Sequence, residues 1–154
     1  MVDHDSPNIR IPPPIIVLTV LVAGFALDGR ITEPQLNNGW SILLGLVAVV
    51  IGFLVGGLAL RGFIRAGTSP EPWKASTSLV ERGVYRYTRN PMYLGMVLVS
   101  LGIAIVAGGL WSLLSVALIW GFLNFFVVTR EESYLSRRFG SDYDIYRCRV
   151  RRWL

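Results

Sequence analysis

Polar, basic and aromatic side chains are concentrated in one short segment, residues 83–95 (GVYRYTRNPMYLG), directly before a long apolar run. Arg86, Arg89 and Asn90 lie within a few residues of that run. If the run lies in hydrocarbon, each of these groups needs a partner, such as a ligand, a lipid headgroup or another part of the chain, because unpaired polar groups are costly there. This segment, which we call the motif segment, is therefore the candidate binding site.

Asn90 and Pro91 predict that a helix begins inside the motif segment. Asn is a common N-cap residue, and Pro suits the first helical turn because its missing N–H would be unpaired there in any case. The apolar run that follows is too long for one membrane span, and Gly108-Gly109 near its middle predicts a turn between two helices, residues 92–107 and 110–129.

A helical hairpin returns the end of its second helix beside the start of its first. We therefore expect Arg130, Glu131 and Glu132, which follow the hairpin, to lie near the motif segment. Guanidinium and carboxylate groups brought together in this way could hold a polar ligand at the membrane boundary.

The composition predicts a membrane protein. Of the 154 residues, 53% are hydrophobic, above the roughly 45–50% of soluble domains, and the formal net charge is +5. The basic residues cluster beside apolar segments, which indicates cytoplasmic loops near anionic headgroups and no nucleic-acid partner. One histidine and one cysteine cannot form a zinc or haem site, so we expect no metal.

We expect an all-α fold, an integral membrane bundle of four transmembrane helices whose cytoplasmic loop and helical C-terminal tail form the site. Basic residues in the loop and tail predict that both termini are cytoplasmic, and we expect the bacterial inner membrane. The expected parts of this single domain are a flexible N-terminus, two transmembrane helices, a motif loop, a transmembrane hairpin and a tail that is helical to Phe139: residues 1–13, 14–63, 64–91, 92–129 and 130–154.

The pattern G-x-Y-x-x-x-R-N-P-x-Y-x-G from Gly83, followed by Arg130-Glu131-Glu132 and by F-G-x-x-Y-x-x-Y from Phe139, resembles a known family. It is similar to the isoprenylcysteine carboxyl methyltransferase and phospholipid methyltransferase family of integral membrane enzymes, over roughly the second half of the chain. The resemblance implies an S-adenosylmethionine-dependent methyltransferase whose lipid-like or amphiphilic acceptor enters from the bilayer.

Carried over residue by residue, the resemblance implies cofactor contacts from Leu79, Val80, Tyr85, Asn90, Pro91, Tyr93 and Glu131, and substrate contacts from Arg89 and Arg130. No catalytic group is implied, because methyl transfer from a sulfonium is a direct displacement that depends on orientation and on excluding water. Two positions depart from the family pattern: Asn90 stands where the family usually has His, and Val127 where the isoprenylcysteine enzymes have an Arg linked to acceptor binding.

Other roles for these residues are also open. We interpret Tyr87, Tyr143 and Tyr146 as interfacial aromatic residues. Arg86 and Arg89 serve equally well as headgroup anchors or as ligand contacts. Glu132 is expected to pair within the tail helix, with Arg137 or Arg138.

Two alternative functions differ in class from a methyltransferase: a sterol-reductase-like enzyme that uses NADPH, and a non-enzymatic membrane subunit. The sequence leaves open the identity of the acceptor, whether O, N or S is methylated, and the oligomeric state.

Overall fold

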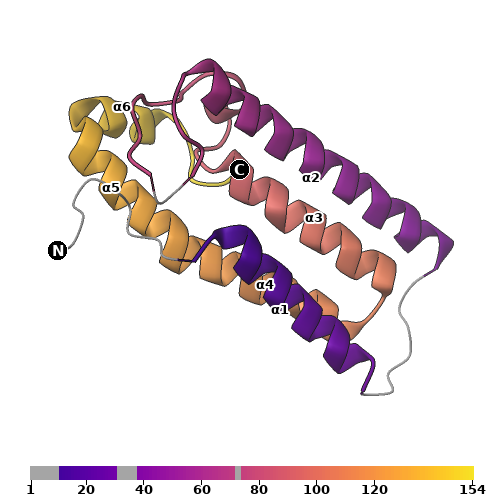
Figure 1. The fold of residues 1–154 in the computed structure, drawn as a ribbon. Helices are drawn as coiled ribbons and strands as arrows, with labels where there is room; N and C mark the ends of the chain where they lie inside the picture. Colours follow the sequence, from indigo (N-terminus) through magenta and orange to yellow (C-terminus); the bar gives the residue numbers. More distant parts are fainter. Residues whose placement is uncertain (1–10, 31–37, 72–73) are drawn as a thin grey trace.

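The computed structural model describes residues 11–30, 38–71 and 74–154, and throughout these ranges the regular structure is helical, without a strand. Residues 1–10 of the expected N-terminus, residues 31–37 of the first loop and residues 72–73 lie outside this description. Figure 1 shows a bundle of long helices with the motif segment and the tail gathered at one end. The elements are α1 (Pro13–Asp28), α2 (Gly39–Arg65), η1 (Gly83–Arg86), α3 (Pro91–Ala107), α4 (Leu110–Phe122), η2 (Leu123–Val128), α5 (Thr129–Phe139) and α6 (Ser141–Arg149).

Helices α2 and α3 approach each other closely because glycines face each other along their contact. A Cβ atom added at Gly52 would lie 2.8 Å from the carbonyl oxygen of Gly95, and Gly45 meets Gly102 in the same way two turns further along. Close backbone approach of this kind is typical of helix pairs in membranes. It places the C-terminal end of α2 beside the start of α3, where the motif segment lies.

The hairpin between α3 and α4 turns at Gly108, as predicted. Gly108 adopts a left-handed conformation (φ 70°) that glycine tolerates best, and α4 begins two residues later. Asp28 at the end of α1 accepts hydrogen bonds from the backbone N–H groups of Trp111 (2.8 Å) and Ser112 (3.0 Å). This contact caps the start of α4 and ties α1 to it.

The second helix of the hairpin runs on without a break into the tail. Between α4 and α5 lies a π-helical segment, η2, and the backbone stays right-handed helical through both of its junctions. Asn124 and Val127 of η2 are buried, and the carbonyl oxygen of Asn124 accepts a hydrogen bond from the hydroxyl of Thr129 at 3.0 Å. Helix α5 ends at Phe139, as expected, and Gly140 (φ 53°) begins the turn into α6.

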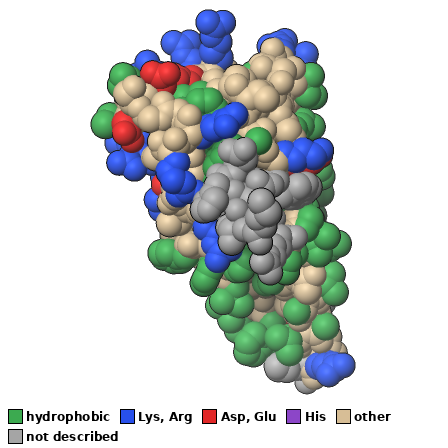
Figure 2. Space-filling view, turned by 60° about the vertical axis from the view of Figure 1, so that its left-hand side comes forward, with side chains coloured by type: hydrophobic (Ala, Val, Ile, Leu, Met, Phe, Trp, Pro, Cys, Tyr) green, Lys and Arg blue, Asp and Glu red, His purple; other side chains and the backbone are tan. Residues whose placement is uncertain are grey.

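Two helical stretches are long and apolar enough to cross a membrane, Gly39–Arg65 and Leu110–Phe139, while α1 and α3 are shorter apolar helices. Large apolar side chains are exposed along α2, among them Leu44 (64%) and Phe53 (67%). Figure 2 shows hydrophobic side chains over the lower part of the molecule and most of the visible Lys and Arg side chains toward the opposite end, with a further basic group at the lower tip. The chain is therefore a membrane protein, and most of the charged side chains that the structure describes gather at the end that carries the motif segment.

We expect Gly52→Ala to destabilise the protein by about 1–3 kcal/mol, because the new methyl group would overlap the backbone of α3. Gly57→Ala is the matched control, since a Cβ atom at Gly57 meets nothing within 4 Å. Thermal unfolding of the two variants in the same detergent tests the contact. Equal melting temperatures for both would contradict the close packing of α2 on α3.

Candidate active site

Two adjoining cavities lie where the ends of α2, α3 and α5 meet the motif segment. The first, which we call the tail cavity, has a volume of about 40 Å³ and is closed by α6 and by residues 76–80. The second, the bundle cavity, has a volume of about 190 Å³ and lies against the starts of α1 and α3. The two cavities share a wall made of Phe63, Tyr85, Arg89, Asn90 and Glu131.

Tyr85 forms the aromatic part of the shared wall. The short helix η1 buries its side chain, which packs edge-to-face on Phe63 with ring centroids 5.6 Å apart. Tyr146 of α6 donates a hydrogen bond to the Tyr85 carbonyl oxygen at 2.8 Å. Burial raises the pKa of the Tyr85 phenol far above its usual value, so at neutral pH it offers an uncharged aromatic face.

Glu131 supplies a carboxylate to both cavities. The hydroxyl of Tyr93 donates a hydrogen bond to Glu131 Oε2 at 2.8 Å. Tyr93 comes from the first turn of α3 and Glu131 from the first turn of α5, so this contact joins the two ends of the hairpin as the sequence predicted. It also fixes the direction in which the carboxylate points.

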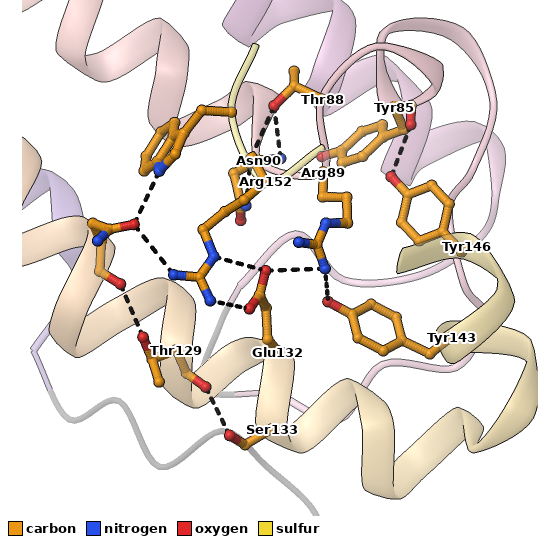
Figure 3. Close-up of polar contacts among 12 residues, drawn as sticks. Tyr85, Thr88, Arg89, Asn90, Thr129, Glu132, Ser133, Tyr143, Tyr146 and Arg152 are labelled. Carbon is orange, nitrogen blue, oxygen red and sulfur yellow. Dashed lines mark hydrogen bonds and ion pairs between the residues drawn. The ribbon is translucent and has the colours of Figure 1, made fainter. Parts of the chain in front are cut away.

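Glu132 is a buried carboxylate at the centre of an ionic cluster. Its Oε1 lies 3.2 Å from Arg89 Nη1, and its Oε2 lies 2.5 Å from Arg152 Nη2 (Figure 3). The prediction that Glu132 pairs with Arg137 or Arg138 is wrong. Residues five or six positions apart do not share a helix face, so the cluster that buries Glu132 uses arginines from the motif segment and the tail instead.

Residues 151–153 return across the motif segment. The carbonyl oxygen of Arg151 accepts from the Arg89 N–H at 2.9 Å, and the carbonyl oxygen of Arg152 accepts from Asn90 Nδ2 at 2.9 Å and from the Thr88 hydroxyl at 3.1 Å. Asn90 stands at the N-cap position of α3, as predicted, but its side chain makes no capping hydrogen bond to the helix. Its amide is held by the tail, while Pro91 occupies the first helical turn as expected.

Asn124 anchors the other side of residues 151–153. Its Oδ1 accepts hydrogen bonds from Trp153 Nε1 at 3.0 Å and from Arg152 Nη1 at 3.4 Å. The sequence reasoning did not single out Asn124, Arg152 or Trp153. A signal was present, because Asn124 is an amide inside an apolar run and a buried amide needs a partner.

Tyr143 and Tyr146 are buried and hydrogen-bonded within the site, so their interpretation as interfacial aromatic residues is wrong. The hydroxyl of Tyr143 accepts from Arg89 Nη1 at 3.4 Å. Burial, reinforced by the nearby Glu132, raises the pKa of Tyr143 to about 12, so it stays protonated at neutral pH. Tyr87, in contrast, is 76% exposed.

The structure distributes the predicted site residues between the two cavities. Most of the shared wall is formed by four of them, Tyr85, Arg89, Asn90 and Glu131, whereas Tyr93 lines only the bundle cavity. Leu79 and Val80 line the tail cavity. Pro91 and Arg130 line neither cavity, and Arg130 is exposed. Among the described residues, no cluster of His, Cys, Asp or Glu could hold a metal ion.

We expect Arg152→Gln to lower the stability by about 1–2 kcal/mol, because Glu132 loses its bidentate partner and Asn124 loses one donor. Arg151→Gln removes the same charge one residue earlier from an exposed side chain and serves as the control. Thermal unfolding in detergent distinguishes them. If the cluster did not stabilise the fold, both variants would have the melting temperature of the wild type.

Comparisons with known proteins identify the family to which the chain belongs. The sequence model of the phospholipid methyltransferase family matches residues 40–142. The protein-S-isoprenylcysteine O-methyltransferase of Schizosaccharomyces pombe is 36% identical over 108 residues, which are 65% of this chain and 45% of the relative. A probable protein-S-isoprenylcysteine O-methyltransferase of Oryza sativa subsp. indica is 30% identical over 142 residues, covering 85% of this chain and 72% of the relative.

A third relative is an uncharacterized protein of Haemophilus influenzae, 38% identical over 63 residues, which are 41% of this chain and all of that protein. This chain matches less than half of the length of the S. pombe relative. No solved structure matches the chain significantly. The family match includes the motif segment, Glu131 and Glu132. The chain belongs to the phospholipid methyltransferase family, which includes the isoprenylcysteine carboxyl methyltransferases.

Proposed function

We propose that this protein is an S-adenosylmethionine-dependent methyltransferase that acts on a lipid-like or amphiphilic acceptor. The observation that carries the proposal is the shared wall between the two cavities. Transfer of a methyl group from a water-soluble donor to a membrane-soluble acceptor needs two binding sites that adjoin each other. The tail cavity suits the donor, and the bundle cavity suits the acceptor.

The lining of the tail cavity fits the chemistry of the cofactor. Leu79, Val80 and Tyr85 offer apolar and aromatic surface for the adenine ring, and Glu131 can accept hydrogen bonds from hydroxyl or ammonium groups. Asn90 and the backbone of residues 78–80 add polar contacts at the edge. The cavity is smaller than the cofactor, so residues 76–80 have to move outward when it binds. Pro91 and Tyr93 help to position this wall. Pro91 begins helix α3, and Tyr93 donates a hydrogen bond to Glu131.

The bundle cavity fits the reacting end of an amphiphile. Apolar residues from α1 and α3, including Pro13, Met92 and Met96, surround it, and Arg89 and Glu131 form its polar end. Bound S-adenosylmethionine would supply a methyl group on a positively charged sulfur. The residues of this chain would then align the acceptor and exclude water, and a carboxylate acceptor would need no general base, whereas an amine would have to lose a proton.

We further propose that α1, α2, α3 and the helix that begins with α4 all cross the membrane, with both termini cytoplasmic. In a bacterium this would be the inner membrane. At about 1.5 Å per residue, α1 and α3 are shorter than the roughly 30 Å hydrocarbon core, so the bilayer would thin around them. The domain parts follow as residues 1–13, 14–63, 64–91, 92–129 and 130–154, with the loop and tail in the cytoplasm.

Calorimetric titration of the detergent-purified protein with S-adenosylmethionine, and in parallel with NADPH, tests the cofactor. We expect saturable binding of the first alone, and Glu131→Gln should weaken it at least about tenfold because one anionic acceptor is lost. Glu81→Gln is the control, since Glu81 forms an exposed ion pair with Arg149. Binding of NADPH alone would favour the reductase alternative, and unchanged affinity in Glu131→Gln would contradict the proposed site.

The acceptor cavity has a separate test. Met96→Trp should fill the bundle cavity and raise the KM for an amphiphilic acceptor about tenfold or more, while the affinity for S-adenosylmethionine stays the same. Ile103→Trp, on the exposed side of the same helix, is the control. The measurement is transfer of a radiolabelled methyl group into membrane lipid extracts. A loss of cofactor affinity with an unchanged acceptor KM would show that the two cavities are assigned the wrong way round.

A further inference from the structure

The guanidinium of Arg89 has an unused edge inside the site. The side chain is 10% exposed, and within the described part of the chain both of its side-chain contacts use Nη1, to Glu132 Oε1 at 3.2 Å and to Tyr143 Oη at 3.4 Å. Nε is buried and has no hydrogen-bond partner in that part of the chain. The edge formed by Nε and Nη2 is therefore free, although Arg89 lines both cavities.

Arg152 shows what the same edge does when it is occupied. Its Nε and Nη2 donate to the two carboxylate oxygens of Glu132, at 3.2 and 2.5 Å, in a bidentate contact. Glu132 is thus shared by two arginines and gives its bidentate contact to Arg152 (Figure 3).

A buried N–H donor without a partner is costly. Tyr143 does not meet Nε, because its hydroxyl accepts from Nη1, and the Oε2 of Glu131 accepts from Tyr93 instead. A planar anion with two oxygens would satisfy the free edge, because the Nε and Nη2 donors of arginine match a carboxylate.

We propose that the Nε/Nη2 edge of Arg89 is a carboxylate subsite at the wall between the two cavities. The inference rests on the proposed function and deepens it. Two ligands could supply the carboxylate: the amino-acid end of S-adenosylmethionine from the tail cavity, or a carboxylate acceptor from the bundle cavity. In both cases the ligand would supply the hydrogen-bond acceptors that this edge lacks.

The test compares ligand pairs that differ only in the carboxylate. The first pair is S-adenosylmethionine and its decarboxylated analogue, and the second is N-acetyl-S-farnesylcysteine and its carboxamide. Each is titrated calorimetrically into the detergent-purified full chain as wild type, as Arg89→Lys and as Arg86→Lys. Lysine keeps the charge but removes the two-donor edge, and Arg86, an exposed residue of the motif segment, is the matched control.

We expect the wild type to bind the carboxylate form of one pair at least about tenfold more tightly than its partner. Arg89→Lys should lose most of this preference, and Arg86→Lys should keep it. A preference in the first pair assigns the subsite to the cofactor, and one in the second pair assigns it to the acceptor.

The absence of a preference in both pairs, or a preference that Arg89→Lys retains in full, overturns the subsite. This result differs from failure of the proposed function, in which the wild type would not bind S-adenosylmethionine at all. The comparison of ligands on the wild type needs no variant, so it stands even if Arg89→Lys unfolds. Thermal unfolding of each variant establishes whether it is folded before the titration.

Discussion

The site depends on one buried carboxylate that joins three distant parts of the chain. Glu132 of α5 contacts Arg89 of the motif segment and Arg152 of the tail, and both contacts lie at the end of the helix bundle. Burying such a cluster adds little net stability, because desolvation offsets the attraction. Its effect is on geometry: with Glu132 in place, the neighbouring Glu131 and Arg89 hold fixed positions in the wall between the cavities.

The membrane explains why this cluster lies where it does. The helix bundle has only a small interior, and most of α2 is exposed apolar surface suited to lipid. The polar contacts that build the site therefore lie at the end that carries Arg89, Glu132 and the tail. The glycine contacts between α2 and α3 and the cap by Asp28 hold the bundle rigid enough to carry that end. Under the proposed function, a methyl donor from water and an acceptor from lipid would meet at this boundary.

The sequence predicted the local elements well and the side-chain partners poorly. The helix start at Pro91, the turn at Gly108 and the end of the tail helix at Phe139 follow from residue types that act on their own backbone. The partners of Asn90 and Glu132 lie 62 and 20 residues away, which no local rule reports. The π-helical segment was also missed, because its apolar sequence is compatible with an ordinary α-helix.

By itself, the sequence determined that the chain is helical and apolar, and it predicted that the motif segment holds the binding site. These properties depend on hydropathy and on local backbone preferences, which neighbouring residues decide. Only the tertiary structure decided that Tyr143 and Tyr146 are buried in the site, that Arg130 stays outside it, and that Arg89 keeps a free edge. Those outcomes depend on how α5 and α6 fold back over the motif segment, because a buried polar group takes its role from the partner that packing brings to it.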